Sequence, residues 1–130
     1  MNRRHAFFAL SSSAFAFSTR SAFAVQGPGF DKATFEAAQA AGKSILLHVA
    51  ATWCETCEAQ RVVIEKLEKD SAFKDLAVLV IDFDKQKDVM RSFGVSQRST
   101  LIAFKGKAEM GRMTGDTTLA AIKAIMTKAL

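Results

Sequence analysis

The chain has 130 residues, of which 49% are hydrophobic, and this is enough for one domain with a packed core and excludes a disordered chain. Two cysteines are too few for the disulfide scaffold of a small secreted protein. The formal net charge is +5, but Arg3, Arg4 and Arg20 lie in a leader that we expect to be removed; taking these three cations from 18 basic and 13 acidic residues leaves +2. That balance does not indicate a nucleic-acid partner.

Residues 1–24 have the pattern of a secretory signal peptide. Positive charge at Arg3 and Arg4 is followed by a mildly apolar stretch over 6–17, and Ala22-Phe23-Ala24 matches the small-x-small cleavage pattern. The uncharged stretch is too short for a comfortable membrane span, so we expect cleavage after Ala24 rather than a retained anchor, and no stable membrane insertion afterwards. The sequence leaves open whether export follows the general or the twin-arginine route.

Cleavage after Ala24 leaves a mature domain over 25–130. The expected destination is an oxidising compartment, most simply a bacterial periplasm. In such a compartment a pair of cysteines separated by two other residues is more typical of a redox site than of a zinc site.

Helices and strands alternate along the mature domain. In chain order we expect a helix over 30–41, a strand over 44–50, a helix over 54–69, a strand over 76–83, a short helix over 85–93, a strand over 100–104, a tight turn at 105–107, an edge strand over 108–113 and a helix over 117–129. The residues predicted to face inward are Phe30, Ala33, Ala37 and Ala40 of the first helix, Ala59, Val62, Val63 and Leu67 of the second, and Leu119, Ile122, Ile125 and Met126 of the last. This order predicts an α/β fold with parallel crossovers, a final antiparallel hairpin and helices on both faces of the sheet.

The stretch Trp53-Cys54-Glu55-Thr56-Cys57 contains the single tryptophan and both cysteines, and it joins the strand over 44–50 to the next helix. A thiolate at a helix N-terminus faces unpaired N–H groups and the positive end of the helix dipole, which lowers its pKa. We therefore predict Cys54 as the nucleophile of a redox-active Cys54–Cys57 pair. Cys57, one turn further on, can attack the mixed disulfide that Cys54 forms, and Trp53 offers an apolar docking surface.

Two acidic residues adjoin the cysteines. Negative charge at Glu55 and Glu58 disfavours the Cys54 thiolate and so favours the disulfide form, and a more stable disulfide makes a more reducing couple. We expect these residues to tune the reduction potential, and the protein to reduce disulfides rather than to oxidise thiols.

Two other interpretations of the cysteines stay open from the residues alone. A static disulfide would close a very short loop and remove little entropy from the unfolded chain. A metal-binding chaperone for copper or zinc would use Cys54 and Cys57 with His48, since two thiolates are half of a tetrahedral zinc site. The redox interpretation, in contrast, keeps the sulfurs for exchange and needs no metal ligand.

The Trp53–Cys57 motif after a buried strand resembles the active site of the thioredoxin family. Phe93-Gly94-Val95, the strand at 99–104, the turn at Gly106 and Gly115 before the last helix also fall in the family's order. The resemblance implies a thioredoxin fold, with a central mixed sheet of about four strands flanked by helices on both faces. It also implies a thiol–disulfide oxidoreductase that acts on protein thiols and disulfides, needs no cofactor, and is reset by a membrane or soluble thiol reductase.

Three positions depart from the family's pattern. Ser99 replaces the cis-proline that faces the cysteines; because a non-proline bond costs roughly 2.5–4 kcal/mol to hold cis, we expect a trans bond or a rearranged loop. His48 replaces the buried acid, and Val80 replaces the lysine that pairs with it. Val62 stands where a proline often kinks the active-site helix.

The departures affect the surroundings of the dithiol and not the dithiol itself. The buried acid is the usual proton acceptor for the resolving cysteine. His48 is a candidate replacement that would relay protons through water, and a packed core histidine without a redox role is the alternative. Trp53, Ser99 and Thr100 are the predicted substrate-facing residues, because an extended peptide can pair with exposed backbone beside the sulfurs.

Overall fold

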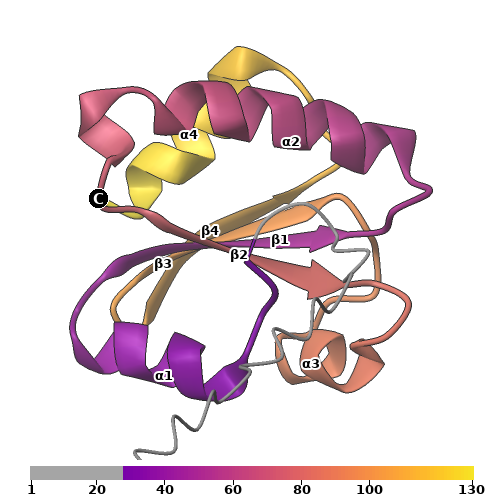
Figure 1. Ribbon diagram of the computed structural model, residues 1–130, viewed down its shortest axis with the longest axis horizontal. Helices are drawn as coiled ribbons and strands as arrows, with labels where there is room; N and C mark the ends of the chain where they lie inside the picture. The colour runs from indigo at the N-terminus through magenta and orange to yellow at the C-terminus, as the bar shows by residue number, and fades with distance from the viewer. Residues whose placement is uncertain (1–27) are drawn as a thin grey trace, which may run out of the picture.

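The computed structural model describes residues 28–130 (Figure 1). The predicted signal peptide and its cleavage site lie outside this range. The described elements are α1 (Lys32–Ala40), β1 (Ser44–Ala50), α2 (Glu55–Glu68), a 3-10 turn (Ser71–Phe73), β2 (Ala77–Asp82), α3 (Lys87–Ser92), β3 (Thr100–Lys105), β4 (Ala108–Thr114) and α4 (Leu119–Lys128). Each strand predicted from the sequence is present, with ends that differ by two residues or fewer.

The strands form one mixed sheet in the order β2-β1-β3-β4. β1 pairs with β2 in parallel and with β3 antiparallel, and β3 and β4 form the expected antiparallel hairpin. Figure 1 shows α2 and α4 on one face and α1 and α3 on the other. The prediction of a four-stranded mixed sheet covered by helices on both faces is therefore confirmed.

The chain enters the fold along the free edge of β2. Gly29 forms a parallel bridge with Val80, and the Phe30 N–H donates to the Val80 carbonyl over 2.7 Å. The next residue, Asp31, caps α1 by accepting from the Thr34 N–H over 2.9 Å. The first helix therefore begins at Lys32, two residues later than predicted, because Phe30 is committed to the sheet edge.

The inward faces of the helices differ in part from the predicted ones. α1 buries Phe35 and Ala38, while Ala33, Ala37 and Ala40 are exposed, because a phenylalanine removes far more apolar surface from water than an alanine does. Leu119 at the start of α4 is also exposed, whereas Ile122, Ile125 and Met126 are buried as expected.

Helix α2 is rotated from the predicted orientation. Its buried residues are Cys57, Gln60, Ile64 and Leu67, whereas Ala59 and Val62 are exposed and Val63 is half-buried. These buried positions are three or four residues apart and so share one helical face. The polar side chain of Gln60 on that face explains why the apolar pattern pointed elsewhere.

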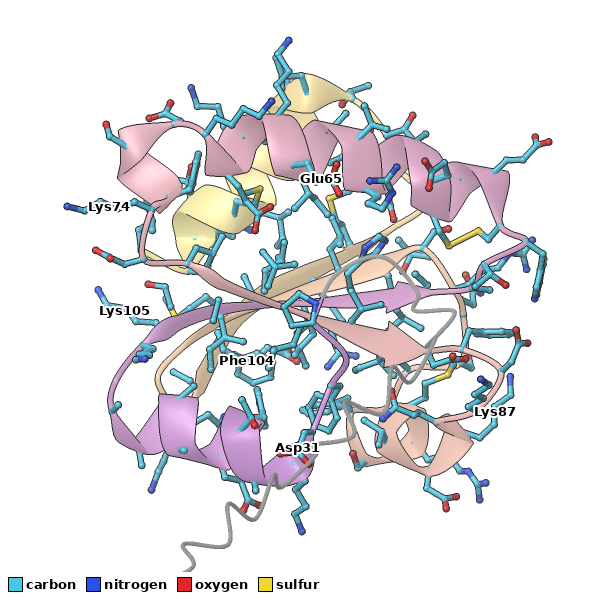
Figure 2. The ribbon with its side chains drawn as sticks, in the orientation of Figure 1. Asp31, Glu65, Lys74, Lys87, Phe104 and Lys105 are labelled. Atoms are coloured by element: carbon cyan, nitrogen blue, oxygen red, sulfur yellow. A yellow bond between two sulfur atoms is a disulfide. The ribbon has the colours of Figure 1, made fainter. Side chains whose placement is uncertain are left out.

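The two faces of the sheet bury different side chains. Under α1 and α3, Phe30, Phe35, Phe93 and Phe104 pack with ring centroids 5.3–5.9 Å apart in tilted and edge-to-face pairs. Figure 2 shows Phe104 between the sheet and α1. The face under α2 and α4 is mostly aliphatic and includes Leu46, Ile64, Leu101 and Ile122. Together these clusters fix the sheet on which the cysteine pair sits.

Candidate active site

The two cysteines lie where β1 ends and α2 begins. After β1 the chain turns through Ala51–Trp53, and Cys54 caps α2: its Sγ accepts the Cys57 N–H over 3.2 Å. Cys54 and Cys57 form a disulfide with Cα atoms 5.3 Å apart, and they are only 5% and 2% exposed. The predicted pair is thus brought together at a helix N-terminus, where backbone N–H groups stabilise a thiolate.

Ser99 lies directly against both sulfurs. Its Oγ is 3.3 Å from Cys54 Sγ and 3.1 Å from Cys57 Sγ, and the residue is 4% exposed. Residues 28–130 contain no cis peptide bond, which confirms the expected trans bond before Ser99, and Ser99 adopts a left-handed φ of +61°. Its N–H donates to the Val49 carbonyl over 2.7 Å, so this backbone group is used within the sheet and is not free for a substrate peptide.

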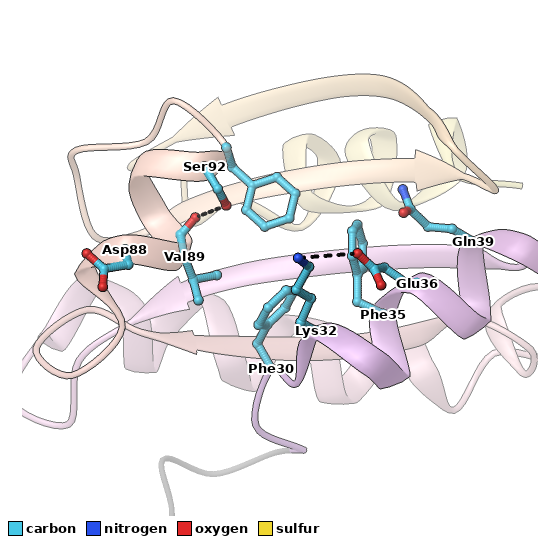
Figure 3. Close-up of a pocket in the computed structure, with 9 residues that line it drawn as sticks. Phe30, Lys32, Phe35, Glu36, Gln39, Asp88, Val89 and Ser92 are labelled. Carbon is cyan, nitrogen blue, oxygen red and sulfur yellow. Dashed lines mark hydrogen bonds and ion pairs between the residues drawn. The ribbon is translucent and has the colours of Figure 1, made fainter.

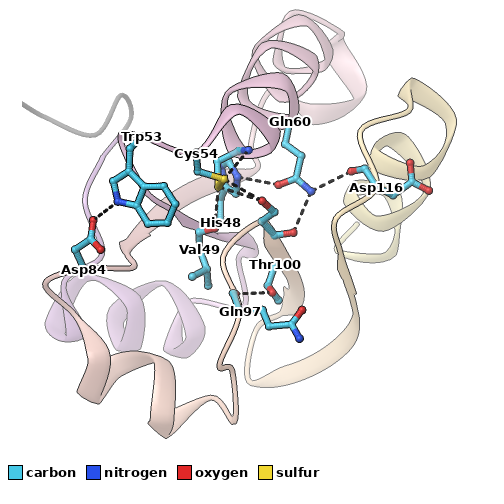
Figure 4. Close-up of a disulfide and its surroundings, with 11 residues drawn as sticks. His48, Val49, Trp53, Cys54, Gln60, Asp84, Gln97, Thr100 and Asp116 are labelled. Atoms are coloured by element: carbon cyan, nitrogen blue, oxygen red, sulfur yellow. Dashed lines mark hydrogen bonds between the residues drawn. A yellow bond between two sulfur atoms is a disulfide. The ribbon is translucent and has the colours of Figure 1, made fainter.

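Gln60 of α2 holds the loop that contains Ser99 (Figure 4). Gln60 was not among the site residues predicted from the sequence. Its amide nitrogen donates to the carbonyls of Ser99 and Asp116, each over 3.0 Å, and its oxygen faces His48 Nε2 at 3.1 Å. The side chain is fully buried. Its position three residues after Cys57, on the same helical face, is the sequence signal that could have identified it.

The Gln60 contacts determine the tautomer of His48. Because both amide hydrogens of Gln60 go to carbonyl oxygens, its Oε1 is the acceptor, and His48 Nε2 must carry the proton. Burial lowers the pKa of His48 to about 4, against a smaller opposing effect of the hydrogen bond to Gln60. His48 is therefore neutral at pH 7. It makes no direct hydrogen bond to either sulfur, and the relay through water remains a prediction.

Trp53 forms an exposed surface beside the disulfide. It is 56% exposed, its Nε1 donates to Asp84 Oδ2 over 2.8 Å, and its ring packs edge-on against Phe83 with centroids 6.1 Å apart. The Arg98 guanidinium lies over the indole, 4.8 Å from the ring centroid, and Lys87 lies over Phe83. Trp53 is thus an exposed aromatic side chain with cations on both sides of the Trp53–Phe83 pair, and its role as a substrate-facing residue stays a prediction.

A groove of about 340 Å³ runs next to Ser99. It is lined by residues that include Phe83, Arg98, Ser99 and Gly115. Thr100, the other predicted substrate-facing residue, is 3% exposed, and its hydroxyl donates to the Gln97 carbonyl over 2.8 Å. The Thr100 side chain closes the loop before β3, and its role as a substrate-facing residue stays a prediction.

The two acidic residues of the motif differ in their surroundings. Glu58 pairs with Arg61, which also binds Glu65, and the hydrogen bond from Arg61 lowers the pKa of Glu58. Glu55 is exposed at the first position of α2, and within residues 28–130 no cation lies within 4 Å of it. Glu55 is therefore the less compensated charge close to Cys54.

Within residues 28–130, the geometry gives the metal alternative no third ligand. Among the described residues, no group of three or more His, Cys, Asp or Glu side chains is arranged to hold a metal ion. The Nε2 of His48, the expected third ligand, points at Gln60 and carries a proton.

Within residues 28–130, no helix is both long and apolar enough to cross a membrane.

A second depression lies on the far side of the molecule, between α1 and α3 (Figure 3). It has a volume of about 360 Å³, and Phe30, Phe35 and Phe93 line it together with charged and polar residues at its edge, among them Lys32 and Asp88. Neither cysteine nor any other predicted site residue lines it. This depression is therefore separate from the Cys54–Cys57 pair.

A cysteine pair at the N-terminus of a helix, following the central strand of a mixed four-stranded sheet, defines a thioredoxin-type redox fold. The family model Thioredoxin matches residues 29–128, so the chain belongs to the thioredoxin family, whose members are disulfide oxidoreductases.

Individual relatives agree with this assignment. Thioredoxin-2 of Saccharomyces cerevisiae is 34% identical over 92 residues, covering 70% of this chain and 86% of the yeast protein. The crystal structure of Trxlp from Edwardsiella tarda EIB202 is 35% identical, with a TM-score of 0.72, and the match covers 75% of this chain and 96% of that one. The thioredoxin of Malassezia sympodialis, 21% identical with a TM-score of 0.66 over 76% of this chain and 88% of that one, shows the shared fold.

Proposed function

We propose that this protein reduces protein disulfides in the bacterial periplasm. The observation that carries the proposal is the Cys54–Cys57 disulfide at the start of α2, with the exposed ring of Trp53 beside it as a docking surface. The periplasmic location is inferred from the signal-peptide pattern of residues 1–24. A membrane or soluble thiol reductase would return the pair to the dithiol form after each turnover, and no further cofactor takes part.

The proposed direction of electron flow follows from the charge close to Cys54. The exposed carboxylate of Glu55 disfavours a thiolate on Cys54, and so stabilises the disulfide relative to the dithiol. The second carboxylate, Glu58, contributes less because Arg61 partly neutralises it. A couple with a stable disulfide gives its electrons to other disulfides.

The reduction potential tests this direction. Equilibration with glutathione redox buffers, followed by the fluorescence of Trp53, gives the potential of the pair. We expect a value below about −200 mV, since thioredoxin-like couples lie near −270 mV and strongly oxidising ones near −120 mV. A value near the oxidising limit would refute the reductase proposal.

Mass analysis of the exported protein tests the location, with a chain that begins at Val25 as the expected result.

Two matched variants test whether the charge of Glu55 lowers the reduction potential. Glu55→Gln removes the uncompensated charge and should make the potential less negative. Glu58→Gln removes a charge that Arg61 already balances and should shift the potential less. Equal shifts for the two variants would contradict the proposed role of Glu55.

A further inference from the structure

We infer that the Ser99 hydroxyl is a catalytic group of this site, which stabilises the thiolates of Cys54 and Cys57 during exchange. Its Oγ lies within hydrogen-bond distance of both sulfurs, at 3.3 and 3.1 Å. Because the sulfurs of a disulfide carry no hydrogen, the hydroxyl is the donor, and its one hydrogen is shared between the two contacts. The inference rests on the exchange chemistry of the proposed function and not on its direction.

Three backbone hydrogen bonds hold Ser99 in place. Its N–H donates to Val49, and its carbonyl accepts from the Gln60 amide over 3.0 Å and from the Gly115 N–H over 2.9 Å. A serine with a φ of +61° is conformationally unfavourable and persists only where the surrounding structure holds it there. The fold therefore maintains a strained conformation that places this hydroxyl against the sulfurs.

Cys57 depends on Ser99 more than Cys54 does. Cys54 Sγ also accepts the Cys57 N–H, whereas Cys57 Sγ has, among residues 28–130, no donor partner other than Ser99. Its remaining contact is with the Val49 carbonyl at 3.9 Å, which can accept the Cys57 S–H hydrogen but cannot stabilise a thiolate. His48 bonds to Gln60 and does not reach the sulfurs directly. The hydroxyl thus occupies the place where the resolving thiolate needs a donor.

The hydroxyl acts in both steps of exchange. The Cys54 thiolate attacks one sulfur of the substrate disulfide; a Cys54–substrate bond forms, the substrate disulfide breaks, and the second substrate sulfur leaves as a thiolate with the electron pair. Cys57 then gives its proton to water and attacks Cys54 Sγ. The Cys54–Cys57 bond forms, and the first substrate sulfur leaves with its electron pair and takes up a proton. Two electrons pass from the dithiol to the substrate, and the Ser99 hydroxyl, which keeps its proton, donates first to Cys54 and then to Cys57.

The test compares Ser99→Ala and Ser99→Gly with the wild-type protein. Both variants lack the hydroxyl, but glycine tolerates the left-handed φ and alanine does not. Far-UV circular dichroism and thermal unfolding show whether each variant folds. The readouts are the pH dependence of Cys54 alkylation, the rate of resolution of a preformed mixed disulfide with a model peptide thiol, and the reduction potential. Ser92→Ala, which removes a hydroxyl from α3, is the control.

Both Ser99 variants should raise the pKa of Cys54, slow the resolution step about tenfold or more at neutral pH, and make the potential more negative, since a hydrogen bond to a charged group is lost. Ser92→Ala should match the wild type. Wild-type alkylation and resolution profiles in either Ser99 variant, or a loss that glycine restores, would overturn the inference. A wild-type protein that resolves the mixed disulfide faster than both Ser99 variants but reduces no protein disulfide would refute the proposed function alone, so the two failures are distinguishable.

Discussion

The phenylalanine cluster that α1 and α3 cover differs from the disulfide end of the sheet in what it buries. The cluster consists of apolar side chains in contact with one another, with Phe35 and Phe104 among them. The buried polar side chains of residues 28–130 are His48, Gln60, Ser99 and Thr100, and they lie in or next to the contacts around Cys54 and Cys57.

This difference shows that the side chains whose burial opposes stability are gathered around the cysteine pair. A buried polar group lowers stability unless its hydrogen bonds are made, and within the described residues every fully buried side-chain nitrogen and oxygen has a partner. The network around Gln60 therefore positions groups at moderate cost, whereas the phenylalanine cluster contributes apolar burial alone. Substitutions in the two regions should separate stability from redox properties.

The largest expected effect is on stability, in the phenylalanine cluster. Phe35→Ala should lower the free energy of unfolding by about 3–5 kcal/mol, because it opens a cavity among packed rings. Denaturant titration measures the loss, and Ala37→Ser on the exposed face of α1 is the control. The reduction potential should stay at the wild-type value, and a shifted potential in a folded variant would break the separation of the two regions.

The second prediction concerns pH and His48. Its pKa is about 4 in the folded protein and 6.5 in the unfolded chain, so between these values the unfolded state binds more protons. Stability is therefore complete above pH 6.5 and falls as the pH drops towards 4, by about 3 kcal/mol over the whole window. Denaturant titrations from pH 7.5 to 4 should show this slope in the wild type.

The matched variant is His48→Leu, which lacks the titrating group. It starts from a lower stability at pH 7, because Gln60 Oε1 loses its partner, but its stability should change little between pH 6.5 and 5. The same slope in both proteins would show that His48 is not buried in neutral form. Exchange rates of this variant also test the predicted proton relay, since unchanged kinetics would leave His48 a structural role.

The third prediction concerns Gln60, whose hydrogen bonds link His48, Ser99 and Asp116. Gln60→Leu leaves the buried His48 Nε2 without a partner, at a cost of about 1–3 kcal/mol, and removes a part-buried hydrogen bond to the Asp116 carbonyl. Because the Ser99 carbonyl also loses a bond, the resolution step should slow. Gln39→Leu, at a half-buried position of α1 away from the cysteines, is the control. A Gln60→Leu protein with wild-type stability and kinetics would show that the network does not position the site.

The smallest expected effect is on substrate preference, through Arg98. Three arginines among residues 28–130 pair with carboxylates, namely Arg61, Arg91 and Arg112, whereas Arg98 lies over Trp53 with no such partner in that range. Arg98→Gln should slow the reduction of a peptide disulfide that has a glutamate beside its cysteine by up to about fivefold at low salt, the strength of an exposed ion pair.

The effect of Arg98 should disappear for the matching glutamine peptide and at high ionic strength, where exposed charges are screened. Arg91→Gln, which removes an already paired arginine from α3, is the control. If Arg98→Gln affects both peptides equally, Arg98 does not select acidic substrates.

Much of the fold could be predicted because β1, β2 and β3 are nearly continuous apolar runs and the cysteine motif is local. Residues 44–50 are one such run, and they form β1 as expected. The orientation of α2 could not be predicted, since Gln60 is a polar residue at a buried position, and its three hydrogen bonds join segments up to 56 residues apart. The place of Ser99 beside the sulfurs followed from the family's pattern, but the burial of Thr100 depends on a loop geometry that no local pattern encodes.

The most direct test of the account is trapping of the exchange intermediate. Reduced Cys57→Ala protein, incubated with a protein that contains an accessible disulfide, should form a mixed disulfide through Cys54 that persists on a non-reducing gel. Removal of Cys54 in the same background should abolish the adduct, since the nucleophile is then absent. A Cys57→Ala protein that folds, carries a free Cys54 thiol and yet forms no mixed disulfide would contradict the conclusion that this pair performs thiol–disulfide exchange.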